Sequence, residues 1–459
     1  MPQIQNKSTL IGNAESRRDR QARKLALGAL EAALGAADPI EVVKSAIVVE
    51  DSNLLVSQHK FDLSIFEHIY VVGGGKASGK MAEALESRLG NRISEGLINV
   101  PYNSGPYSTK RISLQEASHP IPDKAGMEGA KRILELVGQA EKNDLVICLI
   151  SGGGSSLMPL PRSEITLEDK RQVTDALLKS GATINEFNTV RKHISALKGG
   201  WLAKNAYPAT IINLILSDVI GDPLDFIASG PTVPDSTTFG DAIEVLRRYN
   251  LWETTPQSVK TLLVNGQKGL REETPKNEDK VFKKAYNAVV GNNRSATSAA
   301  CSSFRSSGLQ ALLLTSFLEG EARHVGTMLA AITKEVVASG SPLPSPCGIV
   351  VGGETTVTVV GDGKGGRNQE IALSAALKIS GMGGIAIASL STDGIDGPTE
   401  AAGALADGQT LSRSLEREMV AKNFIDRNDS FSFFSELNDA IFTGFTGTNV
   451  NDVSVIVVM

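Results

Sequence analysis

Residues 69–78 read IYVVGGGKAS, an aliphatic run that ends in three glycines, a lysine and two small residues. Three other segments repeat this design: 146–156 (VICLISGGGSS), 288–295 (AVVGNNRS) and 349–356 (IVVGGETT). Each predicts a buried strand, a tight turn and a following helix, and glycine lets such a turn approach a ligand closely. Because ligands of open parallel sheets bind at the carboxyl ends of the strands, the repeated turns predict a phosphate site built from several strand ends.

The pattern around these turns is an alternation of strands and helices, which predicts parallel sheets with helices on both faces. Residues 1–20 are expected to be a tail, and a helix is expected over 22–36. The charged, turn-rich stretch 257–284 is the predicted linker, so we expect domains at 21–256 and 285–459. Further expected strands lie at 96–100, 145–150, 210–216, 288–290, 311–315, 348–351, 356–360, 385–390 and 453–458, with helices at 80–89, 125–141, 167–178 and 317–339.

The composition excludes several classes of partner. With 459 residues and a net charge of −5, the chain gives no reason to expect nucleic acid or an anionic membrane. No apolar run reaches the ~20 residues that cross a bilayer, and the N-terminus lacks the apolar core of a signal peptide. Three cysteines far apart in sequence give neither a metal spacing nor a disulfide framework. We therefore expect a cytoplasmic protein, either a monomer or a homodimer.

The first turn resembles a P-loop, because GGKASGK follows a strand. Met81, however, stands where a P-loop carries the Ser or Thr that binds magnesium. The turn is also similar to a dinucleotide-binding turn, but the next strand ends at residues 99–103 (NVPYN) without the acidic residue that reads the ribose. A tight turn with an exposed lysine is the structural alternative. We favour a functional Lys76 within a phosphate-binding turn that includes Gly74, Gly75 and Ser78.

Two further segments are predicted to bind anions. The turn at 151–156 carries three glycines and two serines, whose N–H and hydroxyl groups suit a phosphate without any charged side chain. Residues 185–200 form a polar helix with a glycine end, which is either an ordinary surface helix or a site helix that presents cations to an anion. The candidate binding residues of these segments are Gly152, Gly153, Gly154, Ser155, Ser156, Asn188, Arg191 and Lys198.

Carboxylates follow two of the predicted strands. Asp218 ends the strand at 210–216 and Asp393 follows the strand at 385–390. Either carboxylate suits Mg²⁺ or a general base, while a helix cap is the alternative. In the loop 361–370 (GDGKGGRNQE), Arg367 opens a helix, and an arginine there suits bidentate pairing with phosphate or carboxylate.

These segments, in order, resemble the class II glycerate kinases, whose C-terminal half is the MOFRL domain. The resemblance runs from about residue 22 to the C-terminus and includes HPIPD at 119–123, GGRNQE at 365–370 and the TDGIDG run at 392–397. It implies a Rossmann-like α/β N-terminal domain with a parallel sheet, a smaller mixed α/β domain, and an active site in the cleft between them.

The resemblance also implies a kinase that uses ATP and Mg²⁺ to phosphorylate D-glycerate, most often to 2-phosphoglycerate, by direct in-line transfer. Lys76 and Arg367 match the family's glycine-turn lysine and glycine-loop arginine. Two alternatives stay open: an NAD(P)-dependent hydroxypyruvate reductase, and a nucleotide sensor without turnover. The remaining residues expected at the site are Asp218 and Asp393 as catalytic residues or metal ligands, and Glu354, Asn368 and Gln369 as binding residues.

Overall fold

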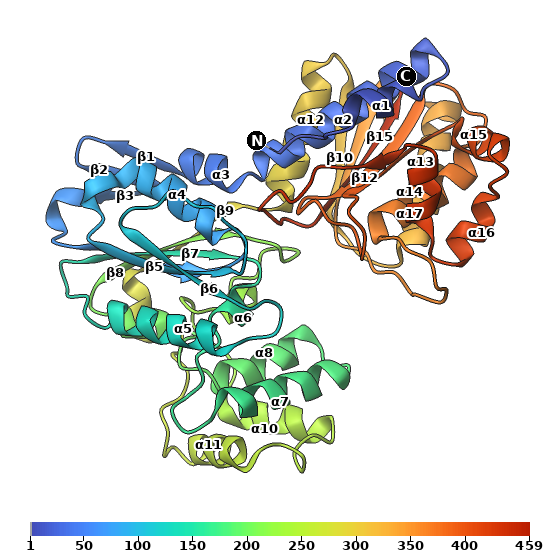
Figure 1. The fold of residues 1–459 in the computed structure, drawn as a ribbon. Coiled ribbons are helices and arrows are strands. Elements are labelled where there is room, and N and C mark those ends of the chain that lie inside the picture. Colours follow the sequence, from blue (N-terminus) through green and yellow to red (C-terminus); the bar gives the residue numbers. More distant parts are fainter. Residues whose placement is uncertain (1) are drawn as a thin grey trace. The chain divides into compact units, whose positions relative to one another are not determined.

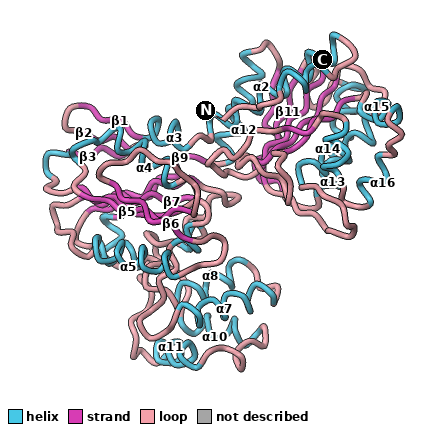
Figure 2. Tube along the Cα trace, in the orientation of Figure 1, coloured by secondary structure: helices cyan, strands magenta, loops and turns pink. Residues whose placement is uncertain are grey.

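The computed structural model describes residues 2–459, which form two compact units (Figures 1 and 2). The parallel-sheet unit runs from Pro39 to Val290. The mixed-sheet unit combines the residues up to Asp38 with Gly291–Met459. The expected domains, 21–256 and 285–459, divide the chain differently, because a helix near the N-terminus packs on the C-terminal sheet.

The parallel-sheet unit contains a six-stranded sheet in the order β6-β5-β4-β7-β8-β9. In order of sequence this is 3-2-1-4-5-6, the strand order of the Rossmann fold, as the resemblance implies. The pairings from β6 across to β8 are all parallel. The strands are β4 (Ile69–Gly74), β5 (Glu95–Pro101), β6 (Ile112–Ala117), β7 (Leu145–Ser151), β8 (Thr210–Leu216) and β9 (Ala285–Gly291).

Helices α4 (Ser78–Leu89), α5 (Lys124–Val137) and α9 (Trp201–Ala206) connect the strands of this sheet. Every residue of β7 is buried, which explains its unbroken apolar sequence. The α5 start was predicted at Asp123, and the Asp123 carboxylate accepts the Gly126 N–H at 2.9 Å. The strand β9 was expected to open the second domain, yet it lies beside β8 at the edge of this sheet.

Four helices form a separate core at one end of the parallel-sheet unit (Figure 1). They are α7 (Leu167–Lys179), α8 (Ile184–His193), α10 (Phe239–Arg248) and α11 (Gln257–Gln267). The predicted linker 257–284 is therefore wrong in its first part, since Val259, Leu262 and Leu263 of α11 are buried in this core. A helix and a small antiparallel sheet that the sequence did not reveal complete the unit: α3 (Pro39–Ala46), β1 (Ile47–Glu50), β2 (Asn53–Val56) and β3 (His59–Asp62).

The mixed-sheet unit holds six strands in the order β10-β11-β15-β12-β13-β14. Only β10 and β11 pair in parallel, and the other neighbours are antiparallel. The expected strand at 356–360 is absent, because Val359 and Val360 are exposed and only Thr356 forms a bridge. The strands are β10 (Gln310–Leu318), β11 (Cys347–Gly353), β12 (Ile385–Ser391), β13 (Gly403–Asp407), β14 (Ala440–Ile441) and β15 (Asp452–Val458).

Helices cover both faces of the mixed sheet (Figure 1). Helices α13 (Ala322–Ser339) and α14 (Arg367–Ile379) share one apolar core with the sheet. Helices α2 (Arg17–Ala36) and α12 (Asn293–Ser306) pack together and on the strands. The remaining helices of this unit are α1 (Lys7–Gly12), α15 (Thr410–Glu416), α16 (Ala421–Asp426) and α17 (Ser430–Glu436).

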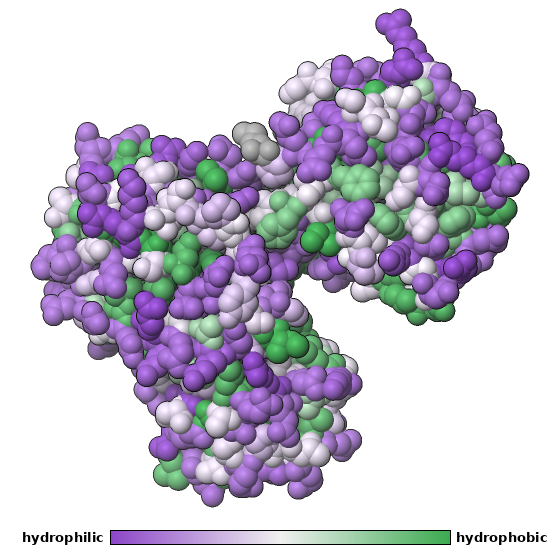
Figure 3. Space-filling view, in the orientation of Figure 1, coloured by the Kyte–Doolittle hydropathy of each residue, from purple (hydrophilic) through white to green (hydrophobic). Residues whose placement is uncertain are grey.

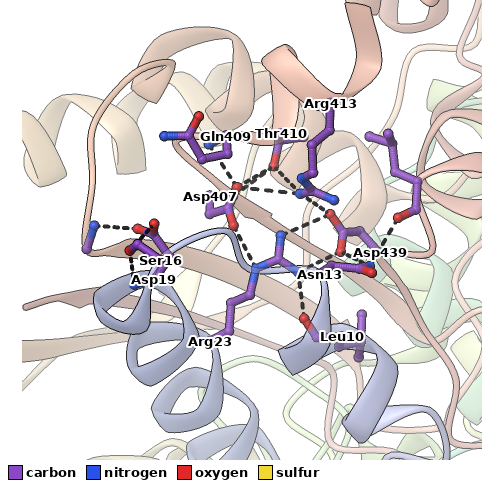
Figure 4. Close-up of polar contacts among 12 residues, drawn as sticks. Leu10, Asn13, Ser16, Asp19, Arg23, Asp407, Gln409, Thr410, Arg413 and Asp439 are labelled. Atoms are coloured by element: carbon purple, nitrogen blue, oxygen red, sulfur yellow. Dashed lines mark hydrogen bonds and ion pairs between the residues drawn. The ribbon is translucent and has the colours of Figure 1, made fainter. Parts of the chain in front are cut away.

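A buried ion-pair network fixes α2 to this unit (Figure 4). The Arg23 guanidinium is fully buried and donates to Asp407 Oδ2 at 2.6 Å and to Asp439 Oδ1 at 2.7 Å. It also donates to the Leu10 carbonyl, and Arg413 contacts Asp439 from the other side at 2.6 Å. These contacts bring α2 to the C-terminal sheet.

In Figure 3, hydrophilic residues dominate the visible surface of each unit, and apolar residues occur in small scattered groups. Within residues 2–459, no helix combines the length and the hydropathy that a membrane span requires.

Candidate active site

The carboxyl ends of β4 and β7 meet at the switch point of the parallel sheet, where ligands bind in folds of this strand order. Two glycine turns follow them: the first glycine turn (residues 73–78) and the second glycine turn (residues 151–156). The Lys76 N–H donates to the Gly152 carbonyl at 2.8 Å, and the Ala77 N–H donates to Ser151 Oγ at 3.0 Å. The two turns therefore interlock as one rigid cradle.

Glycine is required in both turns by close approach. A Cβ on Gly75 would lie 2.1 Å from Ser151 Oγ, and a Cβ on Gly152 would lie 2.0 Å from Asp218 Oδ2. The second contact places the Asp218 carboxylate against the second glycine turn. The structure thus brings Gly74, Gly75, Gly152, Gly153, Gly154 and Asp218 together.

Ser78 has a different place from the expected one. Its side chain is fully buried and hydrogen-bonds to the Leu149 carbonyl and to Ser151 Oγ, each at 3.1 Å. It therefore braces the cradle from behind rather than offering its hydroxyl to a ligand.

Lys76 and His119 both lie close to Gly153. A Cβ on Gly153 would lie 2.9 Å from His119 Nε2 and 3.3 Å from Lys76 Cγ, and the φ of Gly153 is +81°. Burial, followed by the charge of Lys76, lowers the pKa of His119 to about 4. His119 is therefore neutral at pH 7. His119 was not among the predicted site residues, although it begins the HPIPD motif.

A chain of hydroxyl and amide groups starts at Ser155. Its Oγ is 2.8 Å from Ser229 Oγ, which donates to Asn188 Oδ1 at 3.0 Å. Ala228 and Ser229 have φ values of +51° and +60°, although neither is glycine. Such backbone strain costs on the order of 1 kcal/mol per residue and is concentrated at functional sites. Ser156, by contrast, donates back to the Gly153 carbonyl at 3.1 Å, so its hydroxyl closes the turn.

The cations expected from the 185–200 segment lie beside Ser155. Lys198 is fully buried, and its ammonium donates to the Ser155 carbonyl at 2.9 Å and to the Met158 carbonyl at 3.2 Å. Arg191 lies on α8 with its guanidinium 4.9 Å from the centre of the Phe187 ring. Most of the second half of α8 is buried, so this segment is not an ordinary solvated surface helix.

In the mixed-sheet unit, Arg367 begins α14 and pairs with two carboxylates. Its Nε and Nη2 donate to Asp452 at 2.5 and 3.0 Å, and Nη1 donates to Glu354 Oε1 at 2.8 Å. Burial raises the pKa of Asp452 to about 7, although the contact with Arg367 opposes the rise. Asp452 was not among the predicted site residues. It begins β15, which runs antiparallel to β11 and β12, so its first residue lies where those strands end.

The other residues expected from this unit are held by internal contacts. Asp396, which is 1% exposed, accepts the N–H groups of Asn368 at 3.1 Å and Gln369 at 2.9 Å, and both amide side chains also donate to it. The backbone and side-chain N–H groups of Asn368 and Gln369, at the start of α14, are therefore bonded to the Asp396 carboxylate. Asp393 Oδ1 accepts from Ser391 Oγ at 2.8 Å and from the Ile395 N–H at 3.0 Å, closing its own turn.

The two aspartates predicted as metal ligands do not form one metal site within either unit, since Asp218 and Asp393 belong to different units. Across residues 2–459 no group of three or more His, Cys, Asp or Glu side chains is arranged to hold a metal ion. The residues present therefore do not fit a cage made by protein ligands alone. A single carboxylate such as Asp218, beside the second glycine turn, would fit Mg²⁺ if a bound phosphate supplied the further ligands.

Family models match two parts of the chain: a domain of unknown function (DUF4147) over residues 25–264, and the MOFRL family over residues 347–452. A glycerate 2-kinase of Pyrococcus horikoshii is 42% identical over 95% of this chain and 97% of its own length. A D-glycerate 2-kinase of Thermotoga maritima is 41% identical over 90% and 96%. Relatives in Agrobacterium vitis, 42% identical over 84% of this chain, are provisionally named hydroxypyruvate reductases.

Solved structures agree with these relatives. A protein from Pyrococcus horikoshii matches with a TM-score of 0.87 at 42% identity, covering 95% of this chain and 98% of its own. The glycerate kinase of Thermotoga maritima matches with a TM-score of 0.86 at 38% identity, covering 95% and 99%. The chain belongs to the glycerate kinase family that carries a MOFRL domain.

Proposed function

We propose that this protein transfers the terminal phosphoryl group of ATP to D-glycerate, with 2-phosphoglycerate as the product. The names of the Pyrococcus and Thermotoga relatives support both the acceptor and the 2-position. The observation that carries the proposal is the interlocked pair of glycine turns at the switch point, with Lys76 and His119 close to Gly153. The cradle supplies backbone N–H groups and one cation to a phosphate.

In phosphoryl transfer the protein acts chiefly by positioning groups and neutralising charge. Lys76 would neutralise oxygens of the transferring phosphoryl group, and the rigid cradle would keep the acceptor hydroxyl and that group in line. Asp218 is the better placed of the two predicted aspartates to accept the hydroxyl proton or to complete a Mg²⁺ site, because it touches the second glycine turn.

Arg367 is the proposed contribution of the mixed-sheet unit. Its guanidinium is held in a fixed orientation by Asp452 and Glu354. Asp452 is easily neutralised because its pKa is about 7. A substrate oxyanion could therefore replace part of this pairing, and the arginine would then neutralise its charge. Arg367 and Lys76 together would balance the phosphoryl group and the glycerate carboxylate.

The hydroxypyruvate reductase alternative is supported by the Rossmann strand order and by the names of the Agrobacterium relatives. Against it, β5 ends at Pro101 and is followed by Tyr102 and Asn103, without an acidic residue to read a ribose. The amide of Asn99 within β5 is buried and bonds to the carbonyls of Gly126 and Leu157.

The decisive experiment incubates the purified protein with D-glycerate, ATP and Mg²⁺, and identifies the product by NMR. We expect 2-phosphoglycerate, and we expect EDTA to stop its formation. A parallel assay follows NADH oxidation with hydroxypyruvate, where we expect no turnover. Formation of 3-phosphoglycerate would overturn the product assignment, and NADH oxidation without any phosphoglycerate would replace the kinase by the reductase.

A further inference from the structure

Three cations gather beside the second glycine turn in the parallel-sheet unit: Lys170 on α7, Arg191 on α8, and Lys198. Lys170 is 4% exposed and Lys198 is fully buried. Lys170 did not stand out in the sequence, where it is one charged residue of an amphipathic helix. Burying lysines next to each other is unfavourable unless something balances their charge.

The partners of the two lysines are neutral backbone groups. The Lys170 ammonium donates to the Leu160 carbonyl at 3.3 Å, and Lys198 donates to the carbonyls of Ser155 and Met158. Within residues 2–459 no carboxylate lies within ion-pair distance of Lys170, Arg191 or Lys198. Burial, and secondarily the charges of its two neighbours, lower the pKa of Lys198. Burial also lowers the pKa of Lys170, so a bound anion is what would favour the charged form of both lysines.

A cavity of about 530 Å³ opens onto this cluster and is lined by Ser155, Lys170 and Arg191. Its size lies in the range of small-molecule sites. The lining carboxylates, Glu168 and Asp175, pair instead with Arg171 at 3.4 Å and with Lys179 at 2.7 Å.

Part of the wall of this cavity is apolar. Ile121 and Leu178 both line it and are 67% and 66% exposed, so large apolar side chains stand at the opening without cover. Such walls displace water from a bound molecule and strengthen its contact with the cations.

Neutral hydrogen-bonding groups also lie near the three cations, beginning at Ser155. Ser155 Oγ begins the chain that runs through Ser229 to Asn188. The Asn188 amide nitrogen is buried and has no partner among the described residues. Hydroxyl and amide groups of this kind suit the hydroxyls of a small polar substrate.

We infer that this cavity is an oxyanion subsite, in which Lys170 and Arg191 bind the charged head of a substrate and the buried Lys198, which does not line the cavity, adds its charge from behind them. The identity of the ligand rests on the proposed function. If that function holds, the oxyanion is either the carboxylate of D-glycerate or a phosphate of the nucleotide. Inorganic phosphate carries the same chemistry and serves as a probe that is independent of the reaction.

The test compares Lys170→Met and Lys198→Met with the wild type by titration calorimetry. D-glycerate, a non-hydrolysable ATP analogue and inorganic phosphate are each titrated alone. We expect each variant to lose roughly 10-fold or more in affinity for one ligand, because Lys170→Met removes a charge-assisted contact and Lys198→Met removes the charge behind it. Loss for glycerate alone assigns the carboxylate, and loss for the nucleotide alone assigns a phosphate. The control is Lys131→Met, which removes an exposed lysine of α5 that does not line the cavity.

Thermal unfolding without ligand separates binding from a structural role. Methionine has a similar volume and no charge, so a lysine kept for binding should be replaceable without a fall in Tm. A lower Tm with unchanged affinities would overturn the inference, as would affinities within twofold of the wild type for all three ligands. If either variant fails to fold, Arg191→Gln tests the same cluster.

The same titrations distinguish this inference from the proposed function. If the wild type forms no phosphoglycerate but binds inorganic phosphate, and the lysine variants lose that binding, the subsite stands and the kinase proposal fails. If the wild type is an active kinase whose substrate affinities do not change in the variants, the subsite fails alone.

Discussion

Lys76 occupies the position where one point charge has the largest expected effect. It follows the three glycines of the first glycine turn, and its own N–H is bonded to the second turn. Lys76→Met should lower kcat by about 10²–10³-fold with little change in the circular dichroism spectrum, because a preorganised charge at developing phosphate oxygens is removed. Lys76→Arg should not restore the rate, since a planar guanidinium needs more room than this interlocked turn leaves.

Lys131→Met, on the exposed face of α5, is the matched control for Lys76 and should keep the wild-type rate. Near-normal turnover of Lys76→Met would mean that the lysine is only an exposed residue of a tight turn.

His119 gives a prediction for the pH dependence of stability. Its pKa is about 4 in the folded protein, whereas an unfolded histidine titrates near about 6.5. Between these values the unfolded chain binds the proton and the folded chain does not. The stability contributed by His119 is therefore fully present above about pH 6.5 and is lost as the pH falls toward 4.

His119→Gln removes this titration, so the variant should lose less Tm between pH 7 and pH 5 than the wild type does. His324→Gln, an exposed histidine of α13, is the control. Equal losses of Tm in His119→Gln and in the wild type would contradict the lowered pKa. In an NMR titration, the His119 ring protons should change near pH 4.

At the residue scale, the candidate site residues that the sequence could predict are those within a recognisable local motif, such as Lys76, Ser155 and Arg367. It missed Asp452, because an aspartate at the start of a strand looks unremarkable until its antiparallel neighbours are known. It missed Lys170 for a similar reason, since a lysine on an amphipathic helix is usually exposed and only tertiary packing buries it.

At the element scale, the strands of the parallel sheet were predicted well because both faces are covered, which makes their sequences continuously apolar. The edge strand β6 (Ile112–Ala117) was missed, since half of its sequence ISLQEA is polar. The strands β1–β3 were missed because four residues each are too few to show a clear period, although β1 and β2 are mostly apolar. Helix α2 was predicted as a helix, but nothing local in its sequence tells which sheet it covers.

The placement of α2 depends on Arg23, whose guanidinium joins Asp407 and Asp439 (Figure 4). Arg23→Met should destabilise the mixed-sheet unit by about 3–5 kcal/mol, because two buried carboxylates lose a partner. Hydrogen exchange should show faster exchange in α2 and β13, while β4 and β7 of the other unit keep their protection. Arg20→Met, on the exposed side of α2, should change little.

Adding Asp439→Asn to Arg23→Met should restore part of the lost stability, since one uncompensated charge is removed. If Arg23→Met instead unfolds like the wild type, α2 is held by its apolar face alone.

At the scale of the whole molecule, the candidate residues are divided between the two units. Lys76 and the oxyanion subsite belong to the parallel-sheet unit, and Arg367 belongs to the mixed-sheet unit. The division of the chain into two units could not be predicted from the sequence. Contacts with distant segments decide which unit contains residues 2–38 and which contains the strand β9. The proposal that one reaction uses both sets of residues makes Arg367 the residue to test.

Arg367→Ala should lower kcat/KM for glycerate phosphorylation by about 10²–10³-fold, since a charge-assisted contact in the transition state is removed. The substitution leaves Asp452 without its partner, but a buried carboxyl with a pKa already about 7 can take up a proton. Assays at pH 6 therefore separate lost catalysis from lost stability. Arg427→Ala, which removes an exposed arginine paired with Asp362, is the control.

Combining Arg367→Ala with Lys76→Met shows whether the two residues serve the same step. Residues that stabilise one transition state have strongly non-additive effects, so the double variant should be little worse than the poorer single variant. Strictly additive losses would indicate two independent functions. Turnover of Arg367→Ala within threefold of the wild type would show that the arginine only holds Asp452 and Glu354, and that the mixed-sheet unit supplies no charge to the reaction.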